Sequence, residues 1–159
     1  LHLSRGVIEA IDGHRRNEMS EVFDSILTNR PEDAVVVRKM AEVIRSLAIH
    51  GHTIIVGRGS HLITQDLRNG LHVRLVAPRD WRIQQAIADH GLTHEAAVNY
   101  IDKGERERQH YLKTFFSEEP FHPFHHDLII DNSRFNLAQI AEIVFTALSA
   151  RFGETLVGA

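Results

Sequence analysis

The chain has 159 residues, of which 43% are hydrophobic and 25% are charged, and this balance is typical of a globular domain with a hydrophobic core. The formal net charge of −3 gives no reason to expect a nucleic-acid backbone as a partner. No apolar run approaches the roughly 18 residues of a membrane span. Cysteine is absent, which excludes disulfides and thiol catalysis and favours a cytoplasmic protein.

The pattern predicts one α/β domain over residues 1–159, because no repeat, low-complexity tract or linker divides the chain. Apolar residues recur at helical spacing within residues 7–11 and 19–27. Further helices are predicted over Glu32–His50, Asp80–Asp89, Thr93–Asp102, Glu105–Phe115 and Leu137–Phe152. Three short apolar runs predict buried strands of a mostly parallel sheet: Thr53–Gly57, Val73–Ala77 and Leu128–Ile130.

Ligands of such sheets bind beyond the carboxyl ends of the strands, so the residues that follow each strand are candidates for a site. Gly57, Arg58 and Gly59 follow the first predicted strand. The glycines allow a tight turn and a close backbone approach to a ligand, and a guanidinium there is suited to grip phosphate. The alternative is an ordinary turn with a solvated arginine.

Two more arginine-bearing segments follow. Arg79 and Arg82 lie within the first turn of a predicted helix, where a positive charge opposes the helix dipole unless it faces an anion. Arg106 and Arg108 lie on different faces of the helix that begins near Glu105. Solvated surface arginines are the alternative in both places. Together, the three segments predict a polyphosphate site, because phosphoryl transfer depends on positioning and positive charge.

These blocks, in this order, resemble the cytidylate kinase-like family over about residues 34–150. The matching segments are Ile54–Gly59, Val73–Pro78 with Trp81 and Arg82, Glu105–Tyr111, and Asp127–Asn132. The resemblance implies a three-layer P-loop kinase fold with a helical lid over residues 78–126. It also implies transfer of the γ-phosphoryl of ATP, with Mg²⁺, to a nucleoside monophosphate in the cytoplasm.

The resemblance also implies roles for single residues. Gly57, Arg58 and Gly59 would bind the acceptor monophosphate, and Arg82 would lie near the acceptor or the lid. Arg106 and Arg108 would close over the transferred phosphoryl group as the catalytic arginines.

The chain departs from the family pattern at several positions. Glu105 stands where an aspartate is usual, Gly59 replaces an aspartate, and Gln84–Gln85 replace a pair of arginines, so the pattern does not fix cytidine as the acceptor base. No Gly-x-x-x-x-Gly-Lys-Ser/Thr motif occurs. The first strand and the P-loop are therefore expected upstream of Leu1. The alternative function is a catalytically inactive, kinase-like nucleotide-binding or regulatory module.

Twelve histidines are present, with the densest group at His122, His125 and His126. Histidines beside an aspartate can hold zinc, so a histidine-rich metal-binding protein is a third and weaker hypothesis. The neighbouring Pro123 and Phe124 favour a loop that packs on the core instead. Our prediction is therefore that the chain has no metal site.

Overall fold

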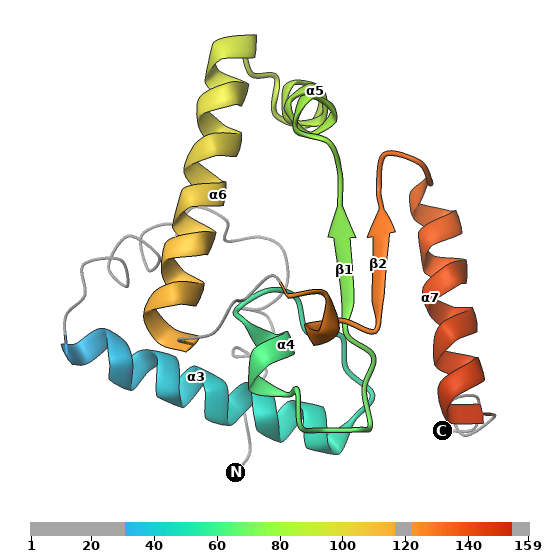
Figure 1. Ribbon diagram of the computed structural model, residues 1–159. Helices are drawn as coiled ribbons and strands as arrows, with labels where there is room; N and C mark the ends of the chain where they lie inside the picture. The colour runs from blue at the N-terminus through green and yellow to red at the C-terminus, as the bar shows by residue number, and fades with distance from the viewer. Residues whose placement is uncertain (1–30, 117–121, 154–159) are drawn as a thin grey trace.

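The computed structural model describes residues 31–116 and 122–153 (Figure 1). The two helices expected within residues 7–27 lie outside the described residues. The described elements, in chain order, are α3 (Pro31–His50), α4 (Ser60–Ile63), β1 (Val73–Val76), α5 (Arg79–His90), α6 (His94–Phe116), the 3₁₀ turn η1 (Pro123–His125), β2 (Leu128–Asp131) and α7 (Leu137–Phe152). No described helix has both the length and the apolarity needed to cross a membrane.

The two strands form a small parallel sheet, with Val73 opposite Leu128 and Val76 opposite Asp131. Helices α5, α6 and η1 lie between them in sequence, so the chain leaves β1, passes through the helices and returns to the same sheet as β2 (Figure 1). A mixed, helix-rich α/β architecture with parallel strands is therefore confirmed. The helical lid over residues 78–126 stays a prediction, and the described part of this range contains α5, α6 and η1.

Helix boundaries follow local capping chemistry. Gly51 adopts a left-handed φ of 73° and its N–H donates to the carbonyl of Leu47, which ends α3 as predicted. Asn136 and Gln139 form a reciprocal capping box at the start of α7. The Thr93 hydroxyl accepts a hydrogen bond from the Ala96 N–H at 3.3 Å, so the predicted helix start near Thr93 is confirmed.

The predicted interruption between Asp102 and Glu105 is wrong, because α6 is one helix of 23 residues. Gly104 lies inside it. A helical glycine costs only about 1 kcal/mol relative to alanine, which the packing of a long amphipathic helix offsets. An ion pair between Lys103 and Glu107, at 3.5 Å, also spans this turn.

The prediction of a buried strand over Thr53–Gly57 is also wrong for the described structure. Residues 53–56 form no strand, and the sheet of the described residues contains β1 and β2 alone. The side chains of Ile54 and Val56 are 90% and 84% exposed. The β-branched run has strand propensity, but a strand also needs a neighbour for its backbone hydrogen bonds, and neither β1 nor β2 supplies one.

Helix α6 packs into two separate hydrophobic clusters. Near its end, Tyr111 and Leu112 pack with Val37 of α3 and Leu62 of α4, and Phe115 and Phe116 cover this cluster. Near its start, Ala97 packs with two residues of α5, Ile83 and Ala86. Both Phe115 and Phe116 are therefore partly buried against the core. One helix thus joins α5 at one end to α3 and α4 at the other (Figure 1).

Candidate functional site

The glycine-flanked arginine lies in a turn of unusual backbone conformation. Gly57, Arg58 and Gly59 have φ values of 73°, 59° and 67°, three left-handed residues in succession. The Ser60 N–H donates to the Gly57 carbonyl at 3.0 Å and closes the turn. A left-handed conformation costs a residue with a Cβ about 1–2 kcal/mol, and such strain concentrates at functional sites. The turn therefore holds Arg58 in a conformation that an ordinary loop would avoid.

Gly59 is a glycine for a steric reason as well. A Cβ at this position would lie 2.7 Å from the ring of Phe116 and 3.3 Å from the side chain of Leu112. An aspartate, which the family pattern has here, would collide with this packing. The glycine at position 59, where the family pattern has an aspartate, thus leaves room for Phe116 at the end of α6.

The turn is attached to α6 by a hydrogen bond. The Tyr111 hydroxyl donates to the carbonyl oxygen of Arg58 at 3.3 Å. Burial lowers the pKa of Arg58 and raises the pKa of Tyr111, so the phenol keeps its proton at neutral pH. A buried tyrosine therefore fixes the backbone of Arg58 beside α6.

Arg82 lies on α5, where Glu105 of α6 holds its guanidinium group. Both terminal nitrogens of Arg82 lie 3.2 Å from Oε2 of Glu105, which joins α5 to α6. The Nε atom of Arg82 is buried and has no hydrogen-bond partner among the described residues. Glu105, whose side chain is longer than that of the aspartate usual at this position, thus reaches from α6 to α5 and orients the guanidinium group of Arg82.

A fourth arginine, Arg74, joins this group and was not selected from the sequence. It lies in the middle of β1 and is half-buried, and its pKa is lowered by burial and by the positive charge of Arg108 on α6. Two guanidinium groups from different elements therefore lie near enough to repel each other. The available signal was a charged residue within the otherwise apolar run Val73–Ala77.

The positions of these groups follow one face of α6. Glu105, Arg108 and Tyr111 are spaced by three residues, so they lie on adjacent turns of the same face. They span about 9 Å along the helix axis, from six residues at about 1.5 Å each. We call Arg58, Arg74, Arg82 and Arg108 the arginine stripe, because each lies on or beside this face.

Arg106 lies outside the arginine stripe. Its charge acts on Asp102, whose pKa is lowered first by its hydrogen bonds to Arg79 and less by Arg106. Arg79 forms a bidentate pair with Asp102, with its Nη2 at 2.9 Å from each carboxylate oxygen. Of the predicted site residues, Arg108 lies on this face of α6, Arg82 pairs with Glu105 of the same face, and the backbone of Arg58 is bonded to Tyr111. Arg106 lies two residues before Arg108, on another face of the helix.

The histidines form ring contacts with one another. The rings of His61 and His126 stack with centroids 4.7 Å apart, and those of His122 and His125 are 5.7 Å apart. Within residues 31–116 and 122–153, no three histidine or carboxylate side chains are arranged to hold a metal ion. The described part of the chain thus offers no support for a metal-binding protein.

The fold and the arginine stripe define the chain as a mixed α/β protein with a parallel sheet and a cationic helical face beside it. The sequence profile of the cytidylate kinase-like family matches residues 2–134, so the chain belongs to this family.

Two further proteins are similar to the chain. A crystal structure of an uncharacterized protein from Eubacterium ventriosum superposes with a TM-score of 0.70 at 15% identity, covering 94% of this chain and 83% of that one. It shares the fold. A uronate isomerase of Corynebacterium glutamicum is 21% identical over 105 residues, which is 66% of this chain. The chain spans only 20% of the length of that isomerase, so the match carries no argument about activity.

Proposed function

We propose that the protein is a nucleoside monophosphate kinase that transfers the γ-phosphoryl group of ATP, with Mg²⁺, to an acceptor nucleotide. The observation that carries this proposal is the arginine stripe. Arg74 and Arg108 repel each other, and a phosphate between them would turn this repulsion into two attractions. Membership of the cytidylate kinase-like family supports the same reaction class.

In this proposal, Arg58 binds the acceptor phosphate and Arg108 stabilises the charge of the transferred phosphoryl group. The strained turn supports the first role, because it fixes the backbone of Arg58 before a ligand arrives. The position of Arg108 on α6 supports the second role, because its positive charge acts on Arg74 of β1. Arg74 and Arg82 complete the positive potential along α6. Arg106, predicted with Arg108 to close over the phosphoryl group, lies at an exposed position of α6.

The proposed fold is that of a P-loop kinase, in which a further strand and its phosphate-binding loop, outside the described residues, complete the sheet. The exposed apolar side chains support this arrangement. Ile54 and Val56 are almost fully exposed, and Leu75 of β1 is 49% exposed. An inserted strand would bury these side chains and supply backbone partners for residues 53–56. The P-loop would then bring the phosphates of ATP to the carboxyl end of the sheet.

The test is a coupled ADP-release assay of the protein at its full natural length, with Mg²⁺-ATP and each nucleoside monophosphate in turn. We expect turnover with at least one acceptor. Arg58→Ala should raise the acceptor KM strongly, and Arg108→Ala should lower kcat by about 10²–10³-fold, the range for loss of one transition-state donor. Arg38→Ala, an exposed change on α3, is the matched control and should leave both constants unchanged.

Full activity in both Arg58→Ala and Arg108→Ala would refute these roles. Nucleotide binding without any turnover would instead support the second candidate, a kinase-like module that binds nucleotide and has lost phosphoryl transfer. The specific observation in favour of that candidate is Gly59, which lacks the carboxylate that the family pattern provides next to the glycine–arginine pair.

A further inference from the structure

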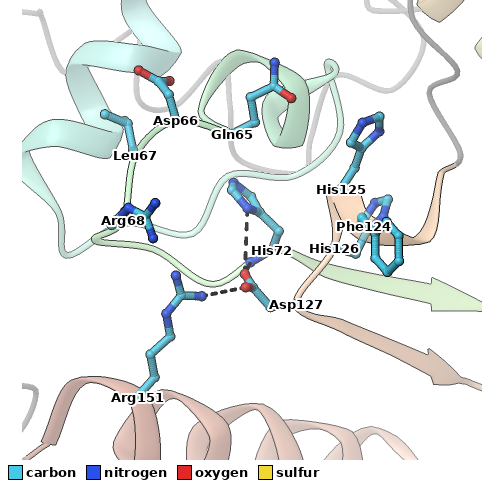
Figure 2. A pocket seen from close by; sticks show the side chains of 10 residues that line it. All are labelled: Gln65, Asp66, Leu67, Arg68, His72, Phe124, His125, His126, Asp127 and Arg151. Carbon is cyan, nitrogen blue, oxygen red and sulfur yellow. Dashed lines mark hydrogen bonds and ion pairs between the residues drawn. The ribbon is translucent and has the colours of Figure 1, made fainter.

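A pocket of about 490 Å³ opens at the amino ends of the two strands (Figure 2). His72 directly precedes β1 and Asp127 directly precedes β2, so the pocket lies at the sheet edge opposite to the carboxyl ends. It is lined by Gln65, Asp66, Leu67, Arg68, His72, Phe124, His125, His126, Asp127 and Arg151. No member of the arginine stripe lines it, so it is a separate site.

Both carboxylates of the pocket are already engaged by donors of the protein. Asp127 accepts a hydrogen bond from the backbone N–H of His72 at 2.7 Å and pairs with Nη1 of Arg151 at 2.6 Å. Asp66 is held by both terminal nitrogens of Arg45, one of them at 2.7 Å. Neither carboxylate therefore needs a cation from outside, and the pocket is not suited to a metal ion.

The pocket retains positive charge. Arg68 is exposed, and it forms no ion pair with any residue in the described ranges. In Figure 2, the guanidinium groups of Arg68 and Arg151 and the ring of His72 surround one space, although they come from the loop after α4, from α7 and from the residue before β1. Donors that approach one space from several directions suit a tetrahedral oxyanion.

His72 adds a hydrogen-bond acceptor to this space. The Thr64 hydroxyl donates to the carbonyl of Ser60 at 2.8 Å, so it accepts from Nε2–H of His72, also at 2.8 Å. Burial is the largest cause that lowers the pKa of His72, and this favours the neutral ring, in which Nδ1 is free to accept a hydrogen bond. This Nδ1 lies 3.7 Å from Oδ2 of Asp127, and a ligand hydroxyl could donate to it.

We propose that this pocket binds a small phosphate-bearing organic molecule. The phosphate oxygens accept hydrogen bonds from Arg68 and Arg151, and the P–OH of a monoanionic phosphate donates to Nδ1 of His72. The pocket is larger than a bare phosphate needs. Phe124, whose side chain is 91% exposed at the rim, offers an apolar ring for the organic part. This site is independent of phosphoryl transfer.

The test is isothermal titration of the full-length protein at pH 6.0 with inorganic phosphate, sulfate and phenyl phosphate. Phosphate should bind more tightly than sulfate, because sulfate has no hydroxyl for His72. Phenyl phosphate should bind more tightly than phosphate, and Phe124→Ala should remove that difference alone. Arg68→Ala should weaken phosphate binding at least about ten-fold, whereas Arg134→Ala, an exposed arginine of similar charge outside the pocket, should not.

Several results would overturn the proposal. These are equal affinity for sulfate and phosphate, equal weakening by Arg68→Ala and Arg134→Ala, and no detectable binding at millimolar phosphate. Amide NMR shifts locate the ligand independently of activity. Shifts at Arg68 and Asp127 support the proposal, and shifts confined to Arg108 would assign the phosphate to the arginine stripe and overturn it.

Discussion

Acid sensitivity of the protein should depend on His126. This residue stacks on His61, and its Nδ1 is buried without a hydrogen-bond partner among the described residues. Its pKa is lowered from 6.5 to about 4. Burial is the largest cause, and the nearby charges of His61, Arg74, His125 and His72 contribute to the same shift. The folded state therefore favours the neutral imidazole, whereas the unfolded chain takes up a proton near pH 6.5.

The sign and size of the effect follow from linkage. Because the pKa is lower in the folded state, the stabilisation is complete above pH 6.5 and is lost as the pH falls toward 4. At pH 5 the two pKa values give a loss of about 2 kcal/mol as an upper limit. His126 is only partly buried, so solvent screening reduces this to about 1 kcal/mol.

The assay is urea unfolding of wild type and His126→Gln at pH 7.5 and 5.0, with the change in unfolding free energy between the two pH values as the readout. This difference cancels any packing loss that the substitution causes at both pH values. We expect the variant to lose about 1 kcal/mol less than wild type on acidification. His94→Gln, an exposed change at the start of α6, is the control. Equal losses for wild type and His126→Gln would refute the reasoning.

Two glycine substitutions test the backbone interpretation. Gly59→Ala should lower the unfolding free energy by about 1–3 kcal/mol, from the left-handed φ and the contact with Phe116, whereas Gly70→Ala, with open space around it, should change it little; equal effects in urea unfolding would contradict this. Gly104→Ala should raise it by about 0.5–1 kcal/mol, because an added methyl at this position in α6 meets no neighbour; a destabilised Gly104→Ala protein would mean that the glycine has another role.

Much of the fold could be predicted from local patterns. The final helix, Leu137–Phe152, was predicted with the observed bounds from its apolar stripe and its terminal glycine, and the structure adds a capping box at its start. The strands at Val73 and Leu128 carry short, mostly apolar runs that include β-branched residues. The run at Ile54 has the same local signal, but strand formation also needs a pairing partner, which no local pattern reports.

The candidate site was less predictable than the fold. Spacing alone places Glu105, Arg108 and Tyr111 on one face of a helix, so the sequence could predict that Arg108 shares a surface with these two residues. The approach of Arg74 to Arg108 depends on how β1 and α6 are placed relative to each other, which no local pattern reports. The pocket before the strands has no such signal in the sequence, because the rule that ligands bind beyond the carboxyl ends of parallel strands points to the other edge of the sheet.

The continuity of α6 constrains how the protein can move. Two bridges, Arg79 with Asp102 and Arg82 with Glu105, attach α5 to the first half of this helix, and Tyr111 anchors its second half to the core. A rotation of α6 about its anchored end near Tyr111 would therefore carry α5 along with it. Arg82 and Arg108 would then travel as one unit, while Arg58, bonded at the pivot, stays behind.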